Sequence, residues 1–168
     1  RGVPRRDRPA WLADIAGWRQ EWQAFLGDRY VGEASPLRPG SVVEAVRAAL
    51  PDDAIITLDS GVHHNWFMQF WEARQPQTML NSWGFSTMGF GVSGALGAKL
   101  AAPDRPVVSI AGDGGFMMTP HVLATAVEFD IAVVWLVWNN FAWGAIRDIQ
   151  YGTFEGREIG TAFYRNDG

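Results

Sequence analysis

Two short polar clusters stand at the ends of neighbouring apolar runs. Gly112-Asp113-Gly114 follows the run Val107–Ala111, and Asn139-Asn140 follows the run Ile131–Trp138. Twenty-four residues, Gly115 to Trp138, separate the clusters, about the length of one turn, one helix and one strand. The carboxyl ends of parallel strands meet at one edge of a sheet, where α/β folds bind ligands. Both clusters are therefore candidates for one binding site.

The residue types in these clusters suit a cation and a phosphate. Asp113 offers a carboxylate oxygen and Asn140 an amide oxygen, the ligand types that Mg²⁺ and Ca²⁺ prefer. The glycines beside Asp113 let backbone N–H groups approach anionic oxygens. A lone Gly-Asp-Gly is usually a tight turn and a lone Asn-Asn a loop. It is their joint spacing that predicts a metal-bridged phosphate site.

An alternating order of strand and helix patterns must position these clusters. The expected strands are Ala54–Leu58, Thr78–Asn81, Pro106–Ala111 and Ala132–Trp138. The expected helices are Pro9–Leu26, Ser41–Leu50, His63–Trp71, Met88–Ala102, His121–Phe129 and Trp143–Tyr151. Such alternation predicts an α/β fold, with a doubly wound, mainly parallel sheet that carries helices on both faces.

Local signals refine three of these helices. Ser41 and Glu44 have the spacing of a capping box, with Ser41 at the N-cap. Thr119 and Pro120 are expected to start the helix that follows the Gly-Asp-Gly cluster. The segment Met88–Ala102 is rich in glycine and alanine, which disfavours an isolated helix but suits one packed very close to the sheet.

The two ends of the chain point to a piece of a longer protein. Residues 1–40 are expected to be a linker, arginine-rich over Arg1–Asp7, and an amphipathic helix from a preceding domain. Residues 41–168 are expected to be the binding domain, with its C-terminal part missing. The chain also opens without a methionine. Gly152–Gly168 could be an active-site loop or a segment that orders against a partner, and its role stays open.

Composition narrows the class of protein. The chain has 168 residues, of which 48% are hydrophobic and 19% charged, and its net charge is −4. These values describe an ordinary globular protein with no polyanion-binding signal, so we expect no nucleic acid partner. The longest apolar run, Ile131–Trp138, is far too short to span a bilayer, so we expect no membrane partner and a cytoplasmic location. The lack of cysteine excludes disulfides and thiolate metal sites. Nine tryptophans are expected mainly as core or interface anchors.

The combined clusters resemble the thiamine diphosphate signature, a Gly-Asp-Gly followed some two dozen residues later by Asn-Asn. Further segments resemble, in order and spacing, the cofactor-binding domain of the acetohydroxyacid synthase-like thiamine diphosphate enzymes: Gly61–His64, Ser86–Gly91, Gly112–Met118 and Asn139–Ala145. The similarity runs from about Gly40 to Tyr151. It implies the thiamine diphosphate-binding fold, with thiamine diphosphate and Mg²⁺ as cofactors.

The resemblance also implies roles for individual residues. The metal ligands would be the side chains of Asp113 and Asn140 and the backbone carbonyl of Ala142. Met88 matches an apolar wedge beneath the thiazolium ring, and Ser86 stands where relatives commonly have glycine. The implied cofactor contacts are Gly61, Val62, His63, Ser86, Met88, Gly114, Gly115, Asn140, Trp143, Gly144 and Ala145.

The implied activity is that of an acetolactate synthase-like decarboxylase or carboligase acting on 2-oxo acids. The glutamate that activates the cofactor in this family comes from another domain, so no catalytic residue beyond the Met88 wedge is expected here, and the chain alone should be inactive. Glu128, Glu155 and Glu158 are interpreted as ordinary surface carboxylates. The remaining domains of the same polypeptide and a homodimer or homotetramer are the expected partners, and FAD in another domain is left open.

Two alternatives remain. Acetohydroxyacid synthases often have a tryptophan where this chain has Ile149, and the run Trp143-Gly144-Ala145 resembles benzaldehyde lyase and the 2-hydroxyacyl-CoA lyases. The second hypothesis is therefore a thiamine diphosphate-dependent C–C lyase acting on a 2-hydroxy ketone or acyl substrate. The third is a non-catalytic cofactor-binding or regulatory module.

Overall fold

The computed structural model describes residues 7–26 and 30–163. The chain divides into two compact units, Arg1–Val42 and Val43–Gly168, which we describe separately. Apart from Asp7, the linker expected over Arg1–Asp7 lies outside the described residues. The domain boundary at residue 40 stays a prediction. None of the helices in the described ranges combines the length and hydropathy needed to cross a bilayer.

The first unit holds helix α1 (Pro9–Leu26), as predicted, and the start of α2 (Pro39–Ala49). Helix α2 begins two residues before Ser41, because a proline fits the first helical position. The Ser41 hydroxyl instead accepts a hydrogen bond from the Gly32 N–H at 2.8 Å and donates one to the Gly32 carbonyl at 3.1 Å. The predicted capping box is therefore wrong, and Ser41 fixes the preceding loop.

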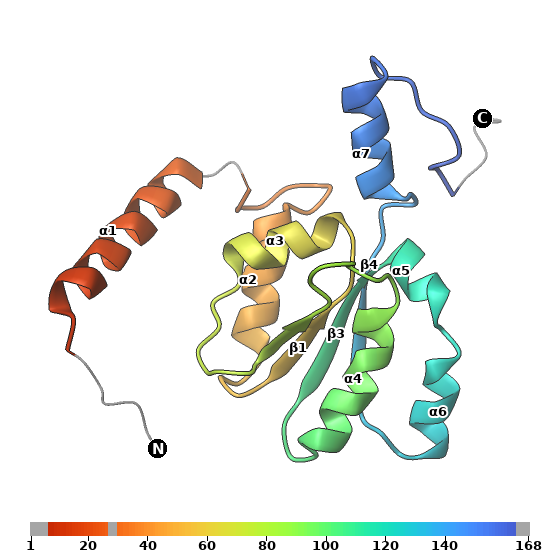
Figure 1. Cartoon of the computed structure of the whole chain (residues 1–168), viewed down its shortest axis with the longest axis horizontal. Helices are drawn as coiled ribbons and strands as arrows, with labels where there is room; N and C mark the ends of the chain where they lie inside the picture. Colours follow the sequence, from red (N-terminus) through yellow and green to blue (C-terminus); the bar gives the residue numbers. More distant parts are fainter. Residues whose placement is uncertain (1–6, 27–29, 164–168) are drawn as a thin grey trace. The chain divides into compact units, whose positions relative to one another are not determined.

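The second unit is built on a parallel sheet of four strands in the order β2-β1-β3-β4 (Figure 1). The strands are β1 (Ile55–Leu58), β2 (Met79–Asn81), β3 (Val107–Gly112) and β4 (Val134–Trp138). The strand order reverses between β1 and β3, which makes their carboxyl ends the place where this class of fold binds ligands. Leu58 pairs with Ile110, and Gly112 pairs with Trp138.

Helices cover both faces of this sheet, as predicted (Figure 1). On one face Ile56, Leu58 and Ile110 form a core with Phe67 of α3 (Val62–Phe70). On the other face, smaller clusters join the alternate strand residues to helices α4 and α6. Those helices are α4 (Phe90–Ala101) and α6 (Val122–Glu128), and their clusters hold Ile55, Val92, Ala95, Ala98, Val107, Ala111 and Val122.

Two short elements differ from the sequence prediction. A helix that was not expected, α5 (Asp113–Met118), begins inside the Gly-Asp-Gly cluster. Thr119 ends α5 instead of starting the next helix, and α6 is preceded by His121 with no side-chain cap. The last described helix is α7 (Gly144–Thr153), which follows the Asn-Asn cluster.

Candidate functional site

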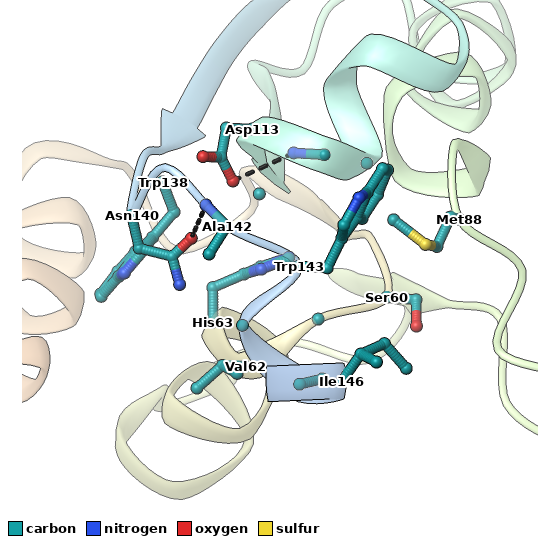
Figure 2. Close-up of a pocket in the computed structure, with 16 residues that line it drawn as sticks. Ser60, Val62, His63, Met88, Asp113, Trp138, Asn140, Ala142, Trp143 and Ile146 are labelled. Atoms are coloured by element: carbon teal, nitrogen blue, oxygen red, sulfur yellow. Dashed lines mark hydrogen bonds between the residues drawn. The ribbon is translucent and has the colours of Figure 1, made fainter. Parts of the chain in front are cut away.

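A cavity of about 150 Å³ lies at the carboxyl ends of β1, β3 and β4 (Figure 2). Its walls come from four separate stretches of the chain: the loop after β1, the residue before the α4 cap, the start of α5 and the loop between β4 and α7. The lining residues are Ser60, Gly61, Val62, His63, Met88, Gly112, Asp113, Gly114, Gly115, Trp138, Asn140, Ala142, Trp143, Gly144, Ala145 and Ile146.

The cavity gathers every residue predicted for the site except Ser86. Ser86 lies outside the lining, but its hydroxyl is 3.1 Å from the hydroxyl of Ser60, which does line the cavity. Its φ of 49° lies in the left-handed region that glycine adopts most easily. This backbone conformation explains why glycine suits the position.

Four further lining residues were not singled out as site residues: Ser60, Gly112, Trp138 and Ile146. Ser60, Gly112 and Ile146 directly adjoin predicted site residues, and Trp138 ends the strand before the Asn-Asn cluster. The only sign in the sequence that these four residues line the cavity was their position close to predicted site residues. The direction in which each side chain points depends on the turns after the strands.

Asp113 occupies the first position of α5 and lines the cavity with a half-satisfied carboxylate. Its Oδ1 accepts a hydrogen bond from the Gly114 N–H at 3.0 Å. Its Oδ2 is buried and has no hydrogen-bond partner within the described part of the chain. Since a buried polar atom without a partner is costly, this oxygen is suited to a cation or a donor that the protein itself does not supply.

The loop after β4 turns back on itself beside Asp113. The Asn140 Oδ1 accepts a hydrogen bond from the Ala142 N–H at 3.2 Å, and the Ala142 carbonyl accepts one from the Gly144 N–H at 2.8 Å. Figure 2 shows Asp113, Asn140 and Ala142 grouped on one side of the cavity. The loop therefore brings an amide oxygen and a backbone carbonyl to the same wall as the carboxylate of Asp113 at the start of α5.

A distant segment fixes this loop from behind. The Trp143 N–H donates to the Thr161 carbonyl, and the Phe163 N–H donates to the Phe141 carbonyl, both at 2.8 Å. These bonds form an antiparallel bridge between Ala142 and Ala162. Successive backbone groups of an extended segment point in opposite directions, so the bridge leaves the N–H and C=O of Ala142 on the other side of the loop.

His63 is almost completely buried at the start of α3, with 2% of its surface exposed. Its pKa is lowered to about 4, first by burial and then by the charge of His64, while hydrogen bonds to the backbone of Asp59 and Ile110 act in the opposite direction. The imidazole is therefore neutral at neutral pH. Its Nε2 is buried and unpartnered within the described ranges, which makes it a second polar atom at the cavity that a ligand could satisfy.

Glycine is required where Trp143 approaches α5. A Cβ atom on Gly114 would collide with the six-membered ring of Trp143. The same indole meets Phe163 edge-on, with ring centroids 4.9 Å apart. Figure 2 shows the Trp143 ring beside the start of α5. Because Gly114 has no side chain, the indole ring of Trp143 can pack directly against the turn that carries Asp113.

The three glutamates interpreted as surface carboxylates all lie on the surface. Glu128 and Glu155 are exposed, and Glu158 accepts hydrogen bonds from the hydroxyls of Tyr151 and Thr161, which lower its pKa. Within the described ranges no group of three or more His, Asp or Glu side chains is arranged to hold a metal ion. A cation in the cavity would depend on a mixed set of carboxylate, amide and backbone oxygens.

Comparison with known proteins identifies the family. Residues 59–167 match the family described as "Thiamine pyrophosphate enzyme, C-terminal TPP binding domain". The chain is 42% identical over 139 residues to the acetolactate synthase isozyme 1 large subunit of Escherichia coli (strain K12), covering 79% of this chain and 25% of that protein. It is 34% identical over 159 residues to the pyruvate oxidase of Lactiplantibacillus plantarum, covering 95% of this chain and 26% of that protein.

A solved structure shares the fold. The thiamine diphosphate-dependent 4-hydroxybenzoylformate decarboxylase of Rhodococcus jostii RHA1 superposes with a TM-score of 0.72 at 30% sequence identity, over 82% of this chain and 26% of that chain. The chain spans about a quarter of the length of these relatives. The parallel sheet, the cavity at its switch point and the matched residues 59–167 agree: this chain belongs to the thiamine pyrophosphate enzymes and carries their C-terminal TPP-binding domain.

Proposed function

We propose that this chain holds the diphosphate end of thiamine diphosphate through Mg²⁺, within an enzyme that decarboxylates or joins 2-oxo acids. The proposal rests chiefly on the unpartnered Asp113 Oδ2 in a cavity that also holds Asn140 and Ala142. Relatives named as acetolactate synthase, pyruvate oxidase and 4-hydroxybenzoylformate decarboxylase support this choice of substrate class.

The residues of the cavity fit the cofactor group by group. Asp113, Asn140 and the Ala142 carbonyl offer the oxygen ligands that Mg²⁺ prefers. At the start of α7 the N–H groups of Trp143 and Gly144 already donate to the carbonyls of Thr161 and Ala142, so the Ala145 N–H is the one that would bind a diphosphate oxygen, favoured by the dipole of this ten-residue helix. Like the Asp113 Oδ2, the Nε2 of His63 is buried without a hydrogen-bond partner in the described ranges, and a polar group of the cofactor would supply one.

The remaining contacts would place the reactive part of the cofactor. Met88 lines the cavity and would serve as the apolar wedge beneath the thiazolium ring, and Gly61, Val62, Gly114 and Gly115 would let the backbone approach the diphosphate. When bound, thiamine diphosphate supplies a carbanion that attacks a carbonyl carbon and accepts electrons as a carboxylate or acyl group leaves. The residues of this chain bind, orient and shield the cofactor.

The size of the cavity supports a shared site. Its volume of about 150 Å³ is well below the roughly 300 to 1,000 Å³ of pockets that enclose drug-sized ligands, so it suits one end of the cofactor. We propose that another domain of the intact protein, in a homodimer or homotetramer, supplies the remaining walls and the activating glutamate. The activity then belongs to the assembled enzyme.

The decisive test compares Asp113→Asn with Asp104→Asn in the intact protein. Asp104 is an exposed residue in the turn before β3, so its variant controls for the lost charge. We expect Asp113→Asn to weaken Mg²⁺-dependent thiamine diphosphate binding by more than about 100-fold in calorimetry, beyond the 10- to 100-fold typical for loss of an outer-shell partner. The Asp104 variant should bind like the wild type.

Turnover separates the enzymatic alternatives. Release of CO₂ from 2-oxo acids by the loaded wild-type protein supports the proposal. Aldehyde release from a 2-hydroxy ketone without CO₂ would identify a lyase, and cofactor binding without any turnover would identify a regulatory module. Absence of Mg²⁺-dependent cofactor binding would exclude both enzymatic functions.

A further inference from the structure

Asp59 is a buried carboxylate directly behind the cavity, and the sequence did not single it out. It follows β1, its surface is 1% exposed, and it does not line the cavity. Both of its oxygens accept the Gly89 N–H, at 3.0 and 2.9 Å, and Oδ1 also accepts the Ser60 N–H at 2.6 Å. Burial raises the pKa of Asp59, while the N–H groups of Ser60, Gly89, Val92 and Gly91 oppose that rise.

Three elements meet at this carboxylate. A Cβ atom on Gly91, in the first turn of α4, would come within 2.5 Å of the Asp59 backbone nitrogen. A Cβ atom on Gly115, in the first turn of α5, would come within 3.2 Å of the Asp59 Cγ. Asp59 therefore fills the space between β1, α4 and α5, and neither helix can shift towards it.

The Gly89 contact determines where Met88 lies. Gly89 has a φ of 86°, a left-handed conformation that links Met88 to the first turn of α4. Its N–H belongs to the peptide bond that joins it to Met88, so the carboxylate of Asp59 fixes the plane of that peptide. Met88 is the residue of this segment that lines the cavity.

We propose that Asp59 is a positioning residue, whose carboxylate holds the Met88–Gly89 peptide and thereby sets the apolar wedge of the cofactor site. The proposal rests on the function proposed above, since it assigns Asp59 to the ring end of the cofactor. The metal at the diphosphate end would depend on Asp113 and Asn140, and Asp59 reaches that end only through the Ser60 N–H and the close approach of Gly115. Loss of the Asp59 carboxylate should therefore affect recognition of the thiamine rings more than recognition of the diphosphate.

The test compares two ligands in the intact protein with Mg²⁺, thiamine diphosphate and inorganic diphosphate. Asp59→Ala removes both oxygens that accept the Gly89 N–H, whereas asparagine would keep one of them. We expect it to weaken thiamine diphosphate binding by about tenfold, the value of one lost hydrogen bond, and to leave inorganic diphosphate binding within about twofold of the wild type.

Thr57→Val is the matched control. The Thr57 hydroxyl donates to the Gly91 carbonyl at 2.6 Å, so the variant loses a buried bond to the first turn of the same helix without touching Gly89. If Asp59 were only a helix cap, both variants would lose stability and both would keep the wild-type ratio of the two affinities. An unchanged ratio in Asp59→Ala would overturn the proposal.

Two further outcomes are distinguishable. If the wild-type protein binds neither ligand with Mg²⁺, the proposed function fails, and the role of Asp59 fails with it. If Asp59→Ala does not fold, amide hydrogen exchange of the wild-type protein supplies the test. Thiamine diphosphate must then protect the Gly89 N–H more strongly than inorganic diphosphate does, and equal protection would overturn the proposal.

Discussion

Two polar atoms at the cavity are buried without a hydrogen-bond partner in the described ranges, Oδ2 of Asp113 and Nε2 of His63. Each such atom costs on the order of 1 to 3 kcal/mol when its partner is missing. Both atoms belong to residues that line one cavity, beside the oxygens of Asn140 and Ala142. Their grouping indicates a site whose hydrogen bonding is completed by a ligand.

Protonation of His63 should make stability depend on pH. Its pKa is about 4 in the folded protein, against 6.5 for an unperturbed histidine. Between these values the unfolded chain binds a proton that the folded protein excludes, so the free energy of unfolding falls as the pH falls from about 6.5 to 4. We expect a loss of about 3 kcal/mol across this window, from about 1.4 kcal/mol per pKa unit.

Urea unfolding of the cofactor-free protein at several pH values measures this loss, and His63→Gln should remove most of it. A smaller slope of the same sign should remain, because partial burial also lowers the pKa of His64. Phe67→Leu, in the same helix, destabilises the core without removing a titrating group and should keep the wild-type slope. A wild-type slope in His63→Gln would contradict the assignment.

Individual site residues could be predicted from the sequence where a short motif contains them. Asp113 and Asn140 stand in recognisable clusters, and the structure brings both to one cavity. Asp59 carried no comparable signal, because its role arises from Gly89, thirty residues away, and from the close approach of Gly115. Contacts of this kind depend on how the strands pair and cannot be recognised from spacing alone.

Among the elements, α4 depends most on small residues. Gly91 is buried at its start, and its carbonyl accepts hydrogen bonds from the hydroxyls of Thr57 and Ser109 in the sheet. Gly91→Ala would force its Cβ to 2.5 Å from the Asp59 nitrogen, so helix and strand must separate. We expect a cost of about 1 to 3 kcal/mol, the usual range for overpacking.

Gly97 is the matched control in the same helix. A Cβ atom there would have no neighbour within 4 Å outside the adjoining helix backbone. Gly97→Ala should therefore raise the free energy of unfolding by about 0.5 to 1 kcal/mol, because alanine favours the helix. Denaturant midpoints compare the two variants, and equal effects would show that α4 does not pack as closely as described.

Element prediction succeeded where a single physical signal dominated. All four strands were expected from apolar runs, and their pairing as a parallel sheet agrees with the alternating order. Helix α5 was missed because two glycines in Asp113–Met118 disfavour a helix, and tertiary packing against Asp59 and Trp143 overrides that preference. The bridge between Ala142 and Ala162 was also missed, since one residue pair leaves no periodic pattern.

At the scale of the molecule, metal and cofactor should stabilise the protein jointly. The carboxylate of Asp113 and the diphosphate repel each other unless a cation lies between them. We expect thiamine diphosphate with Mg²⁺ to raise the free energy of unfolding by about 2.7 kcal/mol at a ligand concentration 100 times its Kd. Either component alone, or both with EDTA, should have little effect in a thermal unfolding measurement.

Equal stabilisation by thiamine diphosphate with and without EDTA would contradict a metal-bridged site. Asp113→Asn supplies the internal control, since it should lose the joint effect while it keeps the unliganded unfolding temperature within a few degrees.

The fold itself could be predicted as a whole because every strand and most helices fit one architecture. The full extent of the site could not be predicted, because the chain covers only about a quarter of the length of its relatives.

The bridge between Ala142 and Ala162 also bears on the order of events during synthesis. A ribosome releases the chain from its N-terminal end, so Asp113 and Asn140 emerge well before Thr161 and Phe163. Until those later residues appear, the Trp143 N–H and the Phe141 carbonyl lack the partners that they have in the folded structure. We therefore expect the loop that carries Asn140 and Ala142 to reach its final conformation only after the segment Thr161–Phe163 has been synthesised.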